Sequence, residues 1–406
     1  MSIYLDHNAG APLRTEAAAV IARLLQDAGG NPSSVHHAGQ RSRRMLEVAR
    51  AQVATIVGAE PRQLVFTSGG TESNNLAIFG AIAAASRRRK IISSEIEHSS
   101  ILAPLAELER RGFDVVREAP DSDGRIDPAR VIAALDSETA IVTLGLANSE
   151  VGTIQDLAPL ASACKESGAL FHVDAAQAVG RIPVDVNARG CDLMTFSGHK
   201  LGAPSGIGAL YIRDYPKNLR SPSPEGRGVR GEVASSFAPT IFGGPHENGM
   251  RAGTPNLLGA VAFGATATAA MNAMSAESDR ITSLASTLLA RLRESIPNLR
   301  LNGPLAGRLP NTINLTFPGV LGESMLIALD LEGVEVSMGS ACAAGAVEPS
   351  HVLRAMGRSV ADARSSLRIS LGWSNTAEEI DIAASIIPAV WRRVAAAEPL
   401  SEVGAR

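Results

Sequence analysis

Two polar side chains, an aspartate and a lysine, close two neighbouring apolar segments of the chain. Asp174 ends the run FHVD, and Lys200 follows the run LMTFSGH. Both runs are typical of buried strands, and ligands in open α/β sheets bind just beyond the carboxyl ends of the strands. Asp174 and Lys200 are therefore expected at one site. A carboxylate that pairs with a pyridinium nitrogen and a lysine that forms a Schiff base are the groups that pyridoxal phosphate (PLP) requires from a protein.

A glycine-rich turn earlier in the chain could hold a phosphate. Residues 67–73 read TSGGTES and stand between a strand pattern and a helical one. The glycines let backbone N–H groups approach an anion, and a helix N-terminus stabilises negative charge by roughly 0.3–2 kcal/mol. The turn is neither a Walker A loop nor GxGxxG. An ordinary helix cap made of glycine and threonine is an equally good interpretation.

His98 and Cys342 could also take part in a reaction, if the fold places them at the same site. His98 falls where a strand pattern gives way to a helix, so it could face the same crevice, although a lone histidine is more often a cap or a core hydrogen-bonder. Cys342 lies in a run of small residues, which gives a thiol exposure and reach. Cys164 and Cys191 are expected as buried apolar side chains.

Composition and charge exclude several classes of protein. The 406 residues are 45% hydrophobic and 19% charged, and a formal net charge of -3 gives no basic surface for nucleic acid or an anionic membrane. Three cysteines without a CxxC spacing argue against a disulfide framework and against a zinc site, so no metal is expected.

The sequence also favours a cytoplasmic protein. Asp6 and His7 interrupt the N-terminal segment before the apolar core of a signal peptide could form. The apolar stretch 257–274 is rich in alanine and glycine, and we predict a buried helix there rather than a membrane span.

The elements that must position these residues alternate between strand and helix. Strand patterns such as 91–94 and 140–144 end in polar clusters and are followed by helical patterns, which predicts a mostly parallel sheet covered on both faces. Residues 216–236 are predicted as a long exposed loop, either a passive insertion or a partner contact. A second glycine-rich loop, 243–254, precedes a C-terminal region with the mixed pattern of an α+β domain.

Taken in order, four motifs resemble those of the class I, NifS/IscS-like, cysteine desulfurases, which are fold-type I PLP enzymes. The motifs are TSGGTES at 67–73, HVDAAQ at 172–177, SGHK at 197–200 and the run of small residues 337–351 around Cys342, here called the cysteine loop. The resemblance covers nearly the whole chain. It implies an α/β fold, with a mostly parallel, seven-stranded type of sheet in a large domain and a smaller α+β C-terminal domain.

The resemblance implies three regions. An N-terminal segment, 1–15, would pack with the small domain. A PLP-binding large domain would span 16–260. The small domain, 261–406, would carry the cysteine loop.

The resemblance also implies a role for each candidate residue. Lys200 would bind the cofactor covalently, Asp174 would pair with its pyridinium nitrogen, and Arg368 would bind the substrate carboxylate. Cys342 would be the nucleophile. The remaining cofactor contacts would be Gly70, Thr71, His98, Gln177, Ser197 and His199 from one subunit and Thr254 from the partner subunit, which implies a homodimer.

The implied reaction converts L-cysteine to L-alanine and leaves the sulfur as a persulfide on Cys342, for transfer to an acceptor protein such as an iron–sulfur scaffold or a thiolation carrier. A base, either His98 or the substrate itself, is expected to help ionise the thiol. Ser149 stands where the family carries an asparagine that contacts cofactor or substrate. The alternatives are another PLP enzyme of this fold, a selenocysteine lyase or aminotransferase, and a non-enzymatic scaffold in sulfur trafficking.

Overall fold

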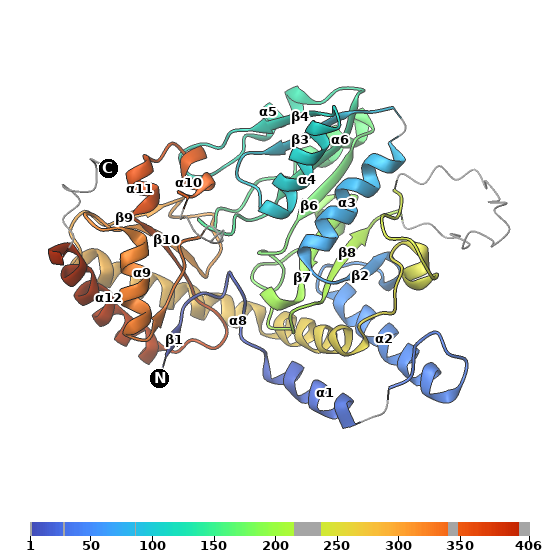
Figure 1. The fold of residues 1–406 in the computed structure, drawn as a ribbon, viewed down its shortest axis with the longest axis horizontal. Helices are drawn as coiled ribbons and strands as arrows, with labels where there is room; N and C mark the ends of the chain where they lie inside the picture. Colours follow the sequence, from blue (N-terminus) through green and yellow to red (C-terminus); the bar gives the residue numbers. More distant parts are fainter. Residues whose placement is uncertain (1, 27–28, 86, 215–236, 340–347, 398–406) are drawn as a thin grey trace.

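The computed structural model describes residues 2–26, 29–85, 87–214, 237–339 and 348–397. Cys342 and the predicted loop 216–236 lie outside these residues. The described chain forms a large part around one sheet and a smaller part around another, joined by a long helix (Figure 1).

The large part is built on a seven-stranded sheet in the order β2-β8-β7-β6-β5-β3-β4. β8 is antiparallel to β2 and β7, and the other neighbouring strands are parallel. The central strands are buried on both faces, which explains why they read as continuous apolar runs. The predicted mostly parallel α/β fold is confirmed. The strands are β2 (Leu64–Thr67), β3 (Lys90–Ser94), β4 (Asp114–Glu118), β5 (Thr139–Gly145), β6 (Leu170–Asp174), β7 (Leu193–Ser197) and β8 (Gly208–Ile212).

Helices cover both faces of this sheet. One face packs against α3 (Gly70–Ala84) and α4 (Ser99–Arg110). The other face packs against α2, α6, α7 and the first half of α8. The bounds are α1 (Thr15–Gln26), α2 (His37–Thr55), α5 (Pro128–Ala134), α6 (Leu160–Ser167), α7 (Val186–Arg189) and α8 (Leu257–Ser295), with 3-10 turns η1 (Pro61–Gln63), η2 (Gly198–Lys200) and η3 (His246–Gly249).

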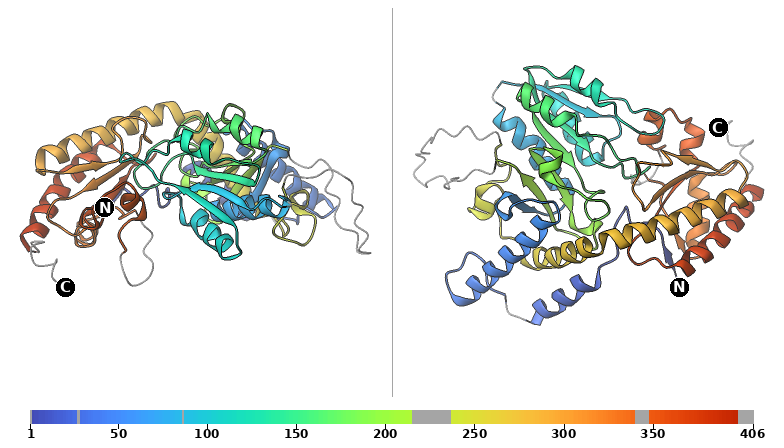
Figure 2. Two further views of the ribbon diagram at one scale, coloured as in Figure 1. Left: turned by 90° about the horizontal axis from the view of Figure 1, so that it is seen from above. Right: turned by 180° about the vertical axis from the view of Figure 1, so that it is seen from behind.

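Helix α8 belongs to both parts of the molecule (Figure 2). Phe263 and Ala267 lie in the core of the large part, whereas Leu288 and Leu292 lie in the core of the small part. By length and composition α8 could cross a membrane, but its side chains contribute to the cores of both parts, as those of a core helix do. The predicted boundary between residues 260 and 261 falls inside α8, and the division into domains stays a prediction.

The smaller part combines an antiparallel sheet, in the order β12-β10-β9, with helices. Its core lies between this sheet, the second half of α8, α9 and α12. The elements are β9 (Arg300–Asn302), β10 (Thr312–Thr316), α9 (Gly322–Leu331), β11 (Val334–Glu335), α10 (His351–Ala355), α11 (Val360–Arg364), β12 (Ser366–Ser370) and α12 (Ala377–Ala397).

The N-terminal segment connects the two parts. Strand β1 (Ile3–Tyr4) pairs in parallel with β11 of the small part. The chain then reaches the large part, where the backbone N–H of Ala11 donates to the carbonyl of His199 at 2.9 Å. Arg14 forms an ion pair with Glu277 of α8 at 2.6 Å. Residues 6–14 are therefore held beside Lys200.

One helix and one strand have features that the sequence analysis did not predict. Helix α2 begins at His37, because Nδ1 of His36 accepts the backbone N–H of Gly39 at 3.2 Å and caps the helix. β9 was not predicted, because three residues are too short a run for an alternating pattern to be recognised.

Gly208 of β8 supplies a test of the packing around the glycine-rich turn. A Cβ atom there would lie 2.7 Å from Cα of Gly69 and 3.0 Å from the carbonyl oxygen of Phe196. We expect Gly208→Ala to lower the free energy of unfolding by roughly 1–3 kcal/mol, because backbone must move to admit the methyl group. Thermal denaturation checks this. Gly29→Ala, where a Cβ atom meets open space, is the control, and equal losses in both variants would contradict the prediction.

Candidate functional site

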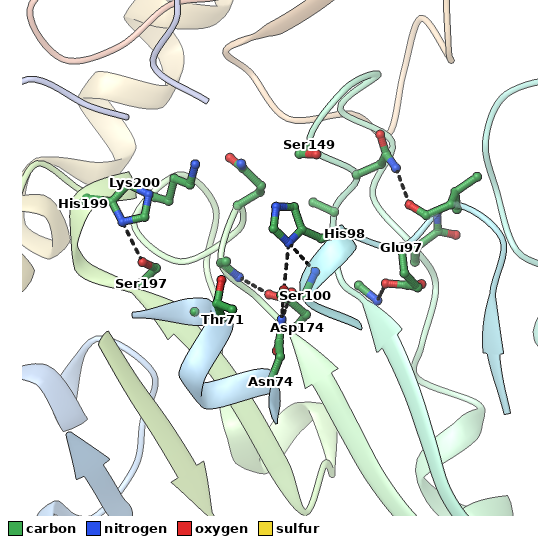
Figure 3. Close-up of a pocket in the computed structure, with 18 residues that line it drawn as sticks. Thr71, Asn74, Glu97, His98, Ser100, Ser149, Asp174, Ser197, His199 and Lys200 are labelled. Atoms are coloured by element: carbon green, nitrogen blue, oxygen red, sulfur yellow. Dashed lines mark hydrogen bonds between the residues drawn. The ribbon is translucent and has the colours of Figure 1, made fainter. Parts of the chain in front are cut away.

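Most of the candidate residues meet in one cavity of about 210 Å³, beyond the carboxyl ends of β5, β6 and β7 (Figure 3). The predicted residues that line it are Gly70, Thr71, His98, Asp174, Gln177, Ser197, His199 and Lys200. The structure therefore brings together strand ends and helix starts that are up to 130 positions apart in the sequence (Gly70 to Lys200).

Asp174 is held in place at the end of β6 by two donors. Its Oδ2 accepts a hydrogen bond from Nδ2 of Asn74 at 2.7 Å, and its Oδ1 accepts the backbone N–H of Ala176 at 2.9 Å. Asn74 was missed by the sequence analysis. A polar residue on the buried face of α3 is the signal that could have identified it.

The predicted phosphate site is formed by the start of α3 and the end of β7. The first-turn N–H groups of Gly70 and Thr71 have no acceptor inside their helix. Oγ of Ser197 lies 2.9 Å from Nδ1 of His199. Burial, followed by the charge of Lys200, lowers the pKa of His199 to about 4, so its imidazole is neutral at neutral pH. Neutral donors and a helix N-terminus suit an anion.

Lys200 is poised to supply a neutral amine. Its Nζ donates to the backbone carbonyls of Asn8 at 2.5 Å and Ala9 at 2.7 Å, both in the N-terminal segment. Burial, then the positive charges of Arg181 and Arg368, lowers the pKa of Lys200 to about 7. The amine is therefore a usable nucleophile and base near neutral pH.

Arg181 is a second residue that the sequence analysis missed. Its guanidinium donates to the carbonyl of Gln177 at 2.8 Å, to Oε1 of Gln177 and to the carbonyl of His7 at 3.1 Å. With Oε1 occupied, the NH₂ group of Gln177 donates to the carbonyl of Asn8 at 3.0 Å. Arg181 thus fixes the orientation of the Gln177 amide. The spacing of four residues between Gln177 and Arg181 was the available signal.

Glu97 places a second carboxyl group in the wall of the cavity. Ser94 Oγ donates to its Oε1 at 2.5 Å, and the backbone N–H of Gly145 donates to its Oε2 at 2.8 Å. Burial raises the pKa of Glu97 to about 8, with the charge of Asp174 acting in the same direction. Glu97 is thus mainly protonated at neutral pH, which leaves Asp174 as the anionic partner for a bound cation.

Three predicted residues are not brought into this cavity by the described chain. Arg368 donates to the carbonyl of Ser149 at 3.2 Å and pairs with Asp6 at 2.7 Å. Its Nε is buried without a partner among the described residues. Thr254 is exposed and lines a separate cavity beside Ser68. Cys342 lies outside the described residues.

The donors and acceptors of the cavity fit PLP. An anion site at the start of α3 suits its phosphate, Asp174 suits a pyridinium nitrogen, and Lys200 suits its aldehyde. In the part of the chain that the structure describes, no cluster of three or more histidine, cysteine, aspartate or glutamate side chains could hold a metal ion.

Comparisons with known proteins agree with this site. The aminotransferase class-V family model matches residues 3–382. The chain is 39% identical to cysteine desulfurase IscS of Dictyoglomus turgidum, over 98% of this chain and 97% of that protein. It is 41% identical to cysteine desulfurase IscS of Pseudomonas syringae pv. tomato, over 98% of this chain and 95% of that protein.

Solved structures show the same likeness. A NifS-like protein superposes with a TM-score of 0.86 at 30% identity, over 97% of this chain and 100% of that chain. DndA from Streptomyces lividans superposes with a TM-score of 0.73 at 34% identity, over 89% of this chain and 97% of that chain. The fold, the cavity and full-length relatives together establish that this chain belongs to the aminotransferase class-V family and, within it, to the PLP-dependent cysteine desulfurases.

Proposed function

We propose that this cysteine desulfurase removes sulfur from L-cysteine with Lys200 as the base and Cys342 as the sulfur acceptor, and then passes the sulfur to a partner protein. The observation that carries the proposal is the convergence of Asp174, Lys200, His98 and the start of α3 on one cavity. The products are L-alanine and a persulfide on Cys342.

Residues of the cavity hold the cofactor in this proposal. Gly70, Thr71, Ser197 and His199 would bind its phosphate, and Asp174 would pair with its ring nitrogen. Gln177 offers an N–H donor to its phenolic oxygen, because Arg181 occupies the carbonyl end of the amide. When bound, PLP accepts the electrons that the substrate releases as its α-proton leaves.

Residues of the chain orient the substrate and move its protons. Arg368 binds the substrate carboxylate with its planar, bidentate fork, a role that requires it to exchange its present contact with Asp6 or to use its unpartnered Nε. Lys200 takes the α-proton, since its pKa of about 7 leaves much of the amine neutral.

The thiol of Cys342 is the group that receives the sulfur. Its thiolate attacks the substrate sulfur, an S–S bond forms, and the bond between sulfur and Cβ of the substrate breaks. The electron pair of that bond stays with carbon. Cβ then receives a proton and Lys200 returns the α-proton to Cα, so that L-cysteine and a thiol become L-alanine and a persulfide with all atoms accounted for.

We further propose a cytoplasmic homodimer. Thr254 is exposed and lies outside the cavity of its own chain, which is compatible with a role in the phosphate site of a partner subunit. The acceptor is an iron–sulfur scaffold or a thiolation carrier. Incubation of the persulfidated enzyme, labelled with isotopic sulfur, with a cell extract identifies it as the protein that becomes labelled.

The lowered pKa of Lys200 gives a pH test. Only a neutral amine attacks an aldehyde, so the rate at which PLP joins the cofactor-free protein should rise as pH increases through about 7 and then level off. The absorbance of the bound cofactor measures this rate, and Lys200→Ala should show no such band. A rate that keeps rising towards pH ~10.4, where an ordinary lysine titrates, would contradict the environment described for Lys200.

The role of Cys342 is tested by substitution. Cys342→Ala should keep the colour of the bound cofactor, because the cysteine does not hold PLP, but should form alanine and transfer sulfur roughly 100-fold more slowly. Cys164→Ala is the matched control, since burial raises the pKa of the Cys164 thiol to about 12 and excludes it as a nucleophile. Desulfuration at full rate by Cys342→Ala would show that the assignment is wrong.

A further inference from the structure

The hydrogen bonds of His98 determine which of its nitrogens carries a hydrogen. His98 is the N-cap residue of α4, and its Nδ1 accepts the backbone N–H of Ser100 at 3.1 Å. A neutral imidazole has one acceptor nitrogen and one N–H. Since Nδ1 is the acceptor, the hydrogen of neutral His98 lies on Nε2.

Two side-chain hydrogen bonds, from Asn74 to Ser100 and from Ser100 to His98, also agree with Nδ1 of His98 as an acceptor. Oγ of Ser100 lies 2.7 Å from Nδ1 of His98, and because Nδ1 is an acceptor the hydroxyl must donate to it. That leaves the lone pairs of Oγ for Nδ2 of Asn74, which donates at 2.8 Å. Ser100 is buried, so no bulk water competes for these bonds.

The orientation of the Asn74 amide follows from its neighbour Asp174. Nδ2 of Asn74 donates to Oδ2 of Asp174 at 2.7 Å. The reverse orientation would place the amide oxygen against a carboxylate, which repels it. Oδ1 of Asn74 is left buried without a partner among the described residues. A buried unpartnered acceptor is unfavourable, and it persists here because the NH₂ group has two acceptors to serve.

The other nitrogen of His98 faces the ligand space. Nε2 bonds none of the described residues, and His98 lines the cavity together with Lys200 and Ser149 (Figure 3). The charged or titratable neighbours that act on it are Asp174, Lys200 and His351. Desolvation by the cavity walls is the largest effect and lowers the pKa of His98, so the neutral ring is the prevailing form.

We propose that Asn74 and Ser100 are positioning residues that hold His98 as a hydrogen-bond donor, and that its Nε2–H binds the sulfur of the substrate. This inference rests on the proposed function, which assigns the substrate carboxylate to Arg368 and the α-proton to Lys200. No binding residue has yet been assigned to the sulfur of L-cysteine, and we assign it to His98.

The role differs from the base that sequence reasoning expects at His98. To accept a proton, His98 would have to free Nδ1 from both donors of Ser100. As a donor it stabilises a substrate thiolate and fixes the sulfur in place for attack, while proton transfer stays with Lys200. A thiolate is a good acceptor for a neutral N–H, because the bond is charge-assisted.

The tautomer can be measured directly in the holoenzyme. Protein labelled with ¹⁵N in its 8 histidines gives NMR signals for the ring nitrogens, and the signal of His98 is the one absent from His98→Gln. At neutral pH we expect a protonated Nε2 and an unprotonated Nδ1. A hydrogen on Nδ1, in either the other neutral form or the imidazolium, would overturn the proposal.

Ser100→Ala tests the positioning role by removing one of the two donors to Nδ1. The NMR titration of His98 should show its pKa raised by roughly half a unit to one unit, a threefold to tenfold change in the protonation equilibrium. Ser99→Ala, at an exposed neighbouring position, is the control and should leave that pKa unchanged. An unchanged pKa in Ser100→Ala would remove Ser100 from the role.

Substitutions of His98 separate a donor from a base. Glutamine supplies an N–H donor but no base, whereas phenylalanine supplies a ring with neither. If His98 is a donor, kcat of His98→Gln should exceed that of His98→Phe by roughly tenfold, and equal losses would overturn the donor role. If the unchanged enzyme formed no alanine from L-cysteine, the proposed function would fail, whereas the NMR result would still report the tautomer.

Discussion

The parallel pairing of β5, β6 and β7 is the constraint on which the site depends. The register places Asp174 opposite Gly145 on one side and Thr195 on the other. Because side chains alternate between the faces of a sheet, a slip of one residue would turn Asp174 away from the cavity and from Asn74. The pairing also sets where β7 ends, and so where the 3-10 turn that contains Lys200 begins.

The N-terminal segment supplies the second constraint. Its carbonyls at Asn8 and Ala9 hold the amine of Lys200, and Asp6 holds Arg368. The same segment begins as a strand paired with the small part. Any change in the relation of the two parts would therefore act on Lys200 and Arg368 together. This gives the short N-terminal segment an importance for the site that its length does not indicate.

The titratable side chains that line the cavity differ in their charge at neutral pH. Burial keeps Glu97 and His199 mainly neutral, and neighbouring cations help to keep Lys200 near its titration point. Asp174, held by Asn74, is then the anion of the site. A site with one anion, neutral donors and an adjustable amine can bind a cationic ring and still move a proton.

The sequence by itself determined the fold class and the family, and it predicted most of the residues that line the cavity. Apolar strands that end in polar clusters, such as FHVD, report a local pattern, and local patterns are readable without coordinates. Motifs in a fixed order then predicted Asp174 and Lys200 as partners of PLP, and both residues line the cavity.

Only the tertiary structure decided which residues orient the others. Asn74 meets Asp174, and Arg181 meets the N-terminal segment, across separations of 100 and 174 positions that no periodicity records. The length of α8 and its place in both cores also emerged only with the fold. The direction of the bonds from Asn74 through Ser100 to His98 is likewise absent from the sequence, since donors and acceptors acquire a direction only when their distances are known.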